Sequence, residues 1–324
     1  MSEDLNRRSF LKGSLLASTG ATLGLSLEER TLLAQAERNP TPRSTKGAAE
    51  PLPMGRIGEL EISRLICGGN LIGGFAHARD LRYVSRLLKA YNTDEKVMDT
   101  LELAEENGIN TIIVDPGATR IINKYWKERG GKIQWIAEGH PRTDDLTTDI
   151  KKSVDNGASA VYLQGVIGDI WYNKGQLELI GETLDVIKDH LIPAGIGAHK
   201  LDVVIESEKA GFNPDFYVKT LHSRSYWSAR REDQTRDVVD NRADNYWSVT
   251  PEKTIEFMRT VKKPWIAYKT LAAGAIRPKD GIKYAFEGGA DFACVGMFDF
   301  QIEEDVAITK RILANLKRDR PWNA

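Results

Sequence analysis

The feature that most constrains the fold is a recurring unit, in which a helix with one polar face ends at glycine and a short apolar run follows. Glycine in the left-handed conformation closes a helix. An apolar run with little alternation is typical of a parallel strand buried on both faces. The pattern predicts eight strands, over residues 63–68, 111–115, 134–139, 160–164, 194–198, 216–219, 265–269 and 292–296.

Helical patterns separate these strands. Strands that alternate with helices over residues 54–324 match the size of a (β/α)₈ TIM barrel. A doubly wound sheet is the alternative, but no G-x-G-x-x-G segment follows a strand. We therefore predict an α/β fold with a single barrel domain. Its helices are predicted over residues 94–107, 119–129, 146–156, 176–189, 201–210, 251–261, 279–287 and 302–316.

Two connections are unusually long, residues 70–93 after the first strand and residues 223–250 after the sixth. Both begin at the carboxyl end of a strand, where barrel proteins build their sites. The second connection carries aromatic residues, including Trp227 and Trp247, among many charges. It is either a solvated excursion fixed by these rings or a lid over a substrate. Aromatic rings beside acids would suit a sugar.

The N-terminus has the pattern of an export signal. Arg7 and Arg8 precede a short, weakly apolar run and an Ala34-Gln35-Ala36 segment. This order resembles a twin-arginine signal peptide over residues 1–36, with an amphipathic surface helix as the alternative. Residues 37–53 read as a proline-rich tether. We expect a periplasmic or extracellular protein that uses the twin-arginine export machinery, without a stable membrane span.

Charge and cysteine content exclude further classes. The chain has 45 Lys and Arg against 46 Asp and Glu, a net charge of −1, which excludes a general nucleic-acid partner. Cys67 and Cys294 lie on the first and last predicted strands, which are neighbours in a closed barrel. They are either buried free thiols or a disulfide, which an oxidising compartment would permit.

Polar side chains gather where the predicted strands end. Burying several charges at one barrel mouth is costly unless they serve a function. We therefore predict a site for a small-molecule substrate at this end. The catalytic candidates are Asp115, Glu138, His199, Lys219, His222 and Lys269. The substrate-binding candidates are Asn70, Gln164, Trp227, Trp247 and Asp299.

Different roles are open to these residues. Glu138 and His140 stand two apart and share one face of a strand, so with His199 and His222 they could hold a divalent metal such as zinc or manganese. Alternatively, Lys219 could be an amine of lowered pKa for Schiff-base chemistry. The structural alternatives are a helix cap at Asp115 and buried lysine–carboxylate pairs.

The chain also resembles the aldo/keto reductases over residues 54–316. The resemblance rests on an opening hairpin at residues 54–63, on Val114-Asp115, on residues 196–199 and 266–274, and on Val295-Gly296-Met297. It implies a TIM barrel and a tetrad of Asp, Tyr, Lys and His that serves hydride transfer from NAD(P)H. Asp115 matches the first member, but no tyrosine follows it, and Glu138 and Gln164 occupy the lysine and histidine positions.

These observations predict an exported barrel enzyme with a non-redox acid/base site, with or without a metal, for a small sugar or carbonyl substrate. Glu138 would act as base or ligand, and Lys219 and Lys269 would stabilise an enolate-like oxyanion. The alternatives are a divergent NAD(P)H-dependent oxidoreductase, in which His199 or Lys219 replaces the tetrad, and a non-catalytic carbohydrate-binding barrel.

Overall fold

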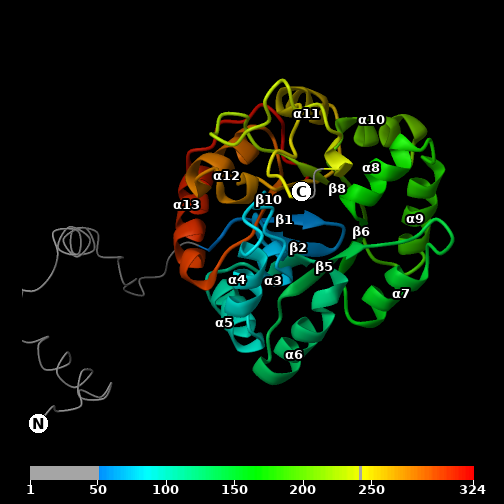
Figure 1. Cartoon of the computed structure of the whole chain (residues 1–324). Helices are drawn as coiled ribbons and strands as arrows, with labels where there is room; N and C mark the ends of the chain where they lie inside the picture. The colour runs from blue at the N-terminus through cyan, green and yellow to red at the C-terminus, as the bar shows by residue number, and fades with distance from the viewer. Residues whose placement is uncertain (1–50, 241–242) are drawn as a thin grey trace, which may run out of the picture. The chain divides into compact units, whose positions relative to one another are not determined.

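A closed barrel of parallel strands forms the folded unit Pro51–Ala324 of the computed structural model, which describes residues 51–240 and 243–324. The helices form a ring around the strands (Figure 1). The predicted (β/α)₈ TIM barrel is therefore confirmed. The barrel strands are β3 (Leu65–Gly68), β4 (Thr111–Val114), β5 (Gln134–Gly139), β6 (Ala160–Leu163), β7 (Ala194–Ala198), β8 (Phe216–Thr220), β9 (Trp265–Tyr268) and β10 (Phe292–Val295).

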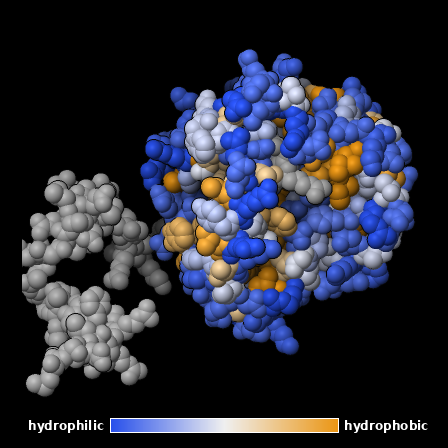
Figure 2. Space-filling view, viewed as in Figure 1, coloured by the Kyte–Doolittle hydropathy of each residue, from blue (hydrophilic) through white to orange (hydrophobic). Residues whose placement is uncertain are grey.

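Eight helices lie close to their predicted positions: α5 (Asp94–Glu106), α6 (Thr119–Arg129), α7 (Thr148–Asp155), α9 (Glu178–Lys188), α10 (Leu201–Ala210), α11 (Pro251–Met258), α12 (Pro278–Glu287) and α13 (Ile302–Ala314). The predicted signal segment and the tether up to residue 50 lie outside the described residues. Among the described residues, no helix is long and apolar enough to cross a membrane. The face drawn in Figure 2 is mostly polar, with apolar side chains in separate groups.

Three α-helices of the described residues were not predicted. Two of them, α3 (Asn70–Gly73) and α4 (Val84–Tyr91), lie within the first long connection. The third, α8 (Gly165–Asn173), has the sequence GVIGDIWYN, in which glycine and β-branched residues lower the intrinsic helix propensity. Packing of α8 against β7 and α9 outweighs this preference.

A hairpin closes the amino-terminal end of the barrel. Strands β1 (Met54–Ile57) and β2 (Leu60–Ser63) pair antiparallel and lead directly into β3. Ile57 and Ile62 are buried and belong to the same apolar cluster as the side chains inside the barrel. The carboxyl end of the strands is therefore the end that remains for a site.

Side chains alternate between the barrel interior and the helix layer along each strand. On β8, Phe216 and Val218 belong to the interior cluster, whereas Tyr217 belongs to the outer cluster. The same alternation separates the two cysteines, since Cys294 belongs to the interior cluster and Cys67 to the outer one. Both are buried free thiols, although β10 and β3 are paired neighbours.

The C-terminal segment is fixed by a buried ion pair. Arg320, which is 2% exposed, lies with its Nη1 2.6 Å from Oδ2 of the fully buried Asp291. Its other guanidinium N–H groups donate to backbone carbonyls, including those of Met258 and Lys263. The backbone N–H of Trp265, the first residue of β9, donates to the same Asp291 oxygen. This network joins the end of the chain to the start of β9.

Asp305 is a buried carboxyl group in the first turn of α13. It is 2% exposed, and its Oδ2 has no hydrogen-bond partner among the described residues. Burial raises its pKa from 3.8 to about 7, with a smaller contribution from Glu304. The folded protein therefore prefers the neutral form of this side chain.

We expect Asp305→Asn to stabilise the protein at pH 8 but not at pH 4. Well below pH 3.8 the carboxyl is protonated in the folded and unfolded chains alike. As the pH rises from 3.8 toward about 7, the unfolded chain ionises while the folded chain keeps the proton, so the folded state loses stability. The gain at pH 8 should be roughly 2–4 kcal/mol, measured by urea unfolding. An equal effect at both pH values would contradict the assignment.

Candidate active site at the barrel mouth

A cavity of about 230 Å³ lies at the carboxyl end of the strands. Its walls come from several strands and from both long connections. The strand residues include Glu138 on β5, Tyr162 on β6, Tyr268 on β9 and Cys294 on β10. The cavity therefore lies where the sequence predicts the site.

The two long connections meet above this cavity. Arg79 in the first pairs with Asp244 in the second, with 2.8 Å between Nε and Oδ1. The ring of His77 packs edge-on against Trp247, with 5.4 Å between the ring centroids. Trp247 is 3% exposed and lines the cavity. The second connection is thus held in place by its aromatic residues and also covers the mouth.

Lys269 is the cation of the cavity. It follows β9 directly, and alternation along the strand would place it on the helix side, because Tyr268 faces the interior. Its backbone has a φ of 57°, a left-handed conformation that interrupts the alternation. Its side chain lines the cavity, and its Nζ lies 4.4 Å from the centroid of the Trp247 ring.

Three buried polar oxygens at the cavity have no hydrogen-bond partner among the described residues. They are the Tyr268 hydroxyl, the Thr270 hydroxyl and Oδ1 of Asn245, and all three residues line the cavity. Unpaired buried polar atoms are rare in folded proteins, and each one calls for a partner such as a ligand or water. These oxygens give the cavity hydrogen-bonding capacity that a ligand or water could satisfy.

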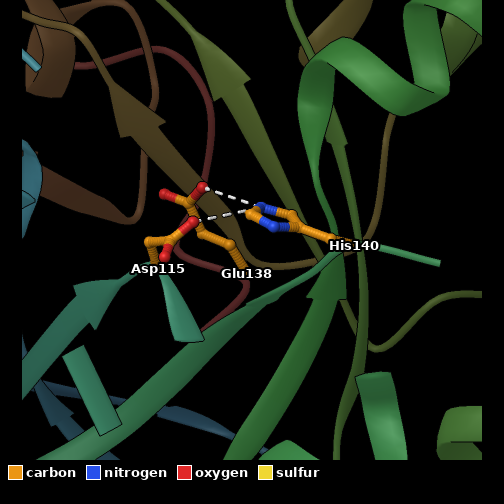
Figure 3. Close-up of side chains that lie close together, drawn as sticks. All are labelled: Asp115, Glu138 and His140. Carbon is orange, nitrogen blue, oxygen red and sulfur yellow. Dashed lines mark ion pairs between the residues drawn. The ribbon is translucent and has the colours of Figure 1, made fainter. Parts of the chain in front are cut away.

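A cluster of two carboxylates and one imidazole lies at the ends of β4 and β5 (Figure 3). Nε2 of His140 is 3.5 Å from Oδ2 of Asp115 and 3.7 Å from Oε2 of Glu138. One ligand atom from each residue lies within 4.8 Å of the others, a spacing that could hold a metal ion. Burial lowers the pKa of His140, but the interactions with the nearby Glu138 and Asp115 carboxylates outweigh burial, so its pKa is raised.

Asp115 has a second contact, since its Oδ1 accepts from the backbone N–H of Gly117 at 2.6 Å. The capping role and the place in the cluster therefore coexist. Glu138 belongs both to this cluster and to the lining of the cavity.

Lys219 does not reach the site, which corrects the prediction of a catalytic role. Its Nζ donates to the backbone oxygens of His199 and Thr220, at 2.8 and 3.1 Å, and to the Thr220 hydroxyl at 2.9 Å. Burial lowers its pKa to about 7. Lys219 follows Val218 by one residue, and alternation places it outside the barrel interior.

His222 and His199 do not join the metal-binding candidates. His222 Nδ1 donates to the Ser223 carbonyl, and its Nε2 accepts from the Ser248 backbone N–H, both at 2.9 Å. These bonds fix the second long connection, and burial lowers the His222 pKa to about 4. His199 Nδ1 lies 2.7 Å from Oδ2 of Asp169. The predicted four-residue metal set is thus reduced to Glu138 and His140, with Asp115 as third member.

His199 lies behind the cavity. Its ring is 4.4 Å from that of Trp247, between centroids, and the side chain is buried. Burial lowers its pKa against the opposing charge of Asp169. Neither His199 nor Asp169 is among the residues that line the cavity.

The substrate-binding candidates have different positions. Asn70 and Trp247 line the cavity. Gln164 caps α8, because its Oε1 accepts from the backbone N–H of Ile167 at 3.3 Å. Trp227 is 86% exposed and does not line the cavity. Asp299 pairs with Lys96 at 2.9 Å and accepts from the Tyr91 hydroxyl at 2.5 Å, so its carboxylate joins helices rather than facing a ligand.

Several residues that line the cavity were missed from the sequence: Tyr162, Tyr268, Thr270, Asn245 and His77. The Asp169–His199 pair behind it was missed as well. Tyr268 immediately precedes the predicted Lys269, and its interior position follows from strand alternation. Asp169 is a charged residue within the apolar run of α8, which is itself a signal for a buried pair. No local pattern marks His77 or Asn245.

Comparisons with known proteins give a fold but no family. No family model matches the chain, and no curated protein matches it in sequence. Two solved structures from Pseudomonas aeruginosa, both provisionally named aldo-keto reductases, have similar folds. One has a TM-score of 0.55 at 16% identity and covers 81% of this chain and 94% of its own. The other has a TM-score of 0.54 at 15% identity, with coverages of 80% and 95%.

We expect Gly165→Ala to disturb the site through Tyr268. A Cβ at Gly165 would overlap the Tyr268 hydroxyl and approach the His199 ring. Overpacking of this kind should cost about 1–3 kcal/mol in unfolding free energy. Tyr268→Phe in the same chain removes the overlapping oxygen and should restore at least half of the loss. Additive effects of the two substitutions in a denaturation cycle would contradict this contact.

Proposed function

We propose that the protein is an enzyme that performs non-redox acid/base chemistry on a small hydroxylated carbonyl compound at the barrel mouth. One observation carries this proposal: the unpartnered oxygens of Tyr268, Thr270 and Asn245 line the same small cavity as Glu138 and Lys269. Hydroxyl and carbonyl groups of a ligand would satisfy these oxygens. The volume of about 230 Å³ favours a small substrate.

The lining provides a base and a positive group for such chemistry. Glu138 would take a proton from the carbon next to the carbonyl group. The Lys269 cation and the Tyr268 hydroxyl would stabilise the negative charge that then develops on the carbonyl oxygen. The buried Trp247 ring above Lys269 would exclude water and offer a face to an apolar side of the ligand.

A divalent metal is an optional part of this proposal. Asp115, Glu138 and His140 supply two oxygen ligands and one nitrogen ligand, a set that suits zinc or manganese. A metal held there would polarise a carbonyl oxygen beside the cavity, since Glu138 belongs to both sites. Without a metal, the same three side chains are a histidine between two carboxylates.

A divergent NAD(P)H-dependent oxidoreductase remains the alternative, because both similar solved structures carry that provisional family name. Against it stand Glu138 and Gln164 at the positions where the resemblance would require lysine and histidine. A non-catalytic carbohydrate-binding barrel is less favoured, since the exposed Trp227 lies away from the cavity.

Export also belongs to the proposal. The twin-arginine pattern at Arg7 and Arg8 would carry the folded protein to the periplasm or beyond. Fractionation of cells that produce the full chain and the variant with both arginines replaced by lysine would test this. Retention of the variant in the cytoplasm is expected, and export of both forms would exclude the signal.

We expect the protein to exchange the carbon-bound hydrogens of dihydroxyacetone or glycolaldehyde with D₂O in the absence of nicotinamide cofactor. Glu138→Gln should slow this exchange by about 10²–10⁴-fold, because an amide cannot accept the proton. Proton NMR follows the exchange, and Glu232→Gln, in the second long connection, is the matched control. Exchange at an equal rate in the Glu138 variant would contradict the role of this residue.

The cofactor alternatives are separable on the same preparation. The proposal predicts a flat NADPH fluorescence titration up to millimolar cofactor, because Asp115 alone matches the tetrad that the resemblance implies. Elemental analysis of protein exported through its own route should find zinc or manganese at one equivalent if the metal is used, and His140→Ala should remove it. Saturable NADPH quenching together with carbonyl reduction would overturn the non-redox assignment.

A further inference from the structure

Two lysines stand at adjacent strand ends, and their surroundings differ because Lys219 is buried whereas Lys269 is half-buried. Lys219 on β8 is 1% exposed, and its ammonium group donates to three oxygen acceptors. Lys269, just after β9, lines the cavity. The first lysine is fully satisfied by the fold, whereas the second faces the ligand space.

No oxygen of the described residues accepts a hydrogen bond from the Lys269 ammonium. Its polar contact is with the His77 imidazole, with 3.2 Å between Nζ and Nε2. Its other neighbours are the rings of Trp247 and Tyr268, whose centroids lie 4.4 and 5.8 Å from Nζ. Aromatic faces stabilise a cation only in part when water is excluded.

The surroundings therefore favour the neutral amine. Burial lowers the Lys269 pKa to about 8, against the opposing charge of Glu138. A substantial fraction of this amine is neutral near pH 8, whereas an ordinary lysine, with a pKa near ~10.4, is almost fully protonated there. The neutral amine is the form that attacks a carbonyl carbon.

The backbone around Lys269 is also unusual. Lys269, Ala272 and Ala273 have φ values of 57°, 45° and 55°, and all three residues line the cavity. Left-handed conformations of residues other than glycine cost free energy and cluster at functional sites. Strand alternation would turn the Lys269 side chain outward. The left-handed backbone at this residue instead brings its amine into the cavity.

We propose that Lys269 is a covalent nucleophile, which forms an imine with the aldehyde or ketone group of a small carbonyl substrate. This inference rests on the proposed function for the substrate class and for Glu138 as the base. It adds the covalent step, in which the Lys269 nitrogen replaces the carbonyl oxygen instead of stabilising a charge on it. It also moves the Schiff-base chemistry predicted for Lys219 to its neighbour on the next strand end.

The step balances with groups already at the cavity. The Lys269 ammonium first gives up one proton, which passes through water or a substrate hydroxyl group to Glu138, and the neutral nitrogen adds to the carbonyl carbon. The C–N bond forms as the C–O π bond breaks, and after proton transfer from nitrogen to oxygen a neutral carbinolamine results. Glu138 then returns its proton to the hydroxyl group, which leaves as water. One ammonium and one carbonyl thus become one protonated imine and one water, without an oxidant or reductant.

The imine would serve the acid/base chemistry of the same site. A protonated imine withdraws electrons more strongly than a carbonyl group, so the hydrogen on the adjacent carbon becomes more acidic. Glu138, again a carboxylate, would accept that proton. The Tyr268 hydroxyl would bind the oxygen that leaves as water, and hydrolysis would release the product by the reverse sequence.

Reductive trapping tests the imine directly. The full chain is incubated at pH 7 with limiting glycolaldehyde and sodium cyanoborohydride, which converts an imine to a stable secondary amine, and modified lysines are located by peptide mass mapping. We expect the adduct at Lys269 to exceed that at any other lysine by at least tenfold. Lys269→Arg should lose this adduct, and Lys219→Arg, at the buried lysine of β8, should retain it.

The peptide map of the unaltered protein decides the question even if a variant fails to fold. Adducts spread evenly over surface lysines, or concentrated at Lys219, would overturn the proposal. If the Glu138-dependent hydrogen exchange occurs while Lys269 remains unmodified, the covalent step is wrong and the acid/base function stands. If neither exchange nor trapping occurs, the proposed function itself fails.

Discussion

The cost of removing charge from water governs this structure, because most of its polar chemistry lies at strand ends inside a ring of helices. In most places a specific hydrogen-bonding or charged partner offsets the cost of burying a charged side chain. Asp291 pairs with Arg320, Asp169 pairs with His199, and the Lys219 ammonium donates to three oxygens. These groups are stabilised, and for that reason none of them is available to a ligand.

At the mouth cavity, several polar groups lack such partners. Lys269 has an imidazole and aromatic rings around its ammonium, and three buried oxygens nearby lack hydrogen-bond partners among the described residues. The two long connections cover these unpaired groups, since the Arg79–Asp244 pair joins the connections and the buried Trp247 covers Lys269. A site with unmet hydrogen-bonding capacity and restricted water is suited to a small polar substrate.

The sequence was sufficient for the barrel because the strands are encoded locally by apolar runs, and several helix ends by a glycine such as Gly108 or Gly211. It also placed Glu138 and Lys269 at the mouth. It could not separate Lys219 from Lys269, since that difference depends on strand parity and on one left-handed residue. Nor could it predict the Asp169–His199 pair or the contact of His77 with Lys269, which depend on how distant segments meet.

Lys269 is central because the fold provides no oxygen acceptor for its ammonium group among the described residues. A ligand is therefore its expected partner. An NMR pH titration of ¹³C-labelled lysine side chains, assigned through Lys269→Arg and Lys219→Arg, measures this directly. We predict that the Lys269 signal titrates near pH 8 and shifts when glycolaldehyde is added, while the Lys219 signal does not respond to the aldehyde. A Lys269 midpoint near the ordinary value of ~10.4, unchanged by the aldehyde, would contradict the account.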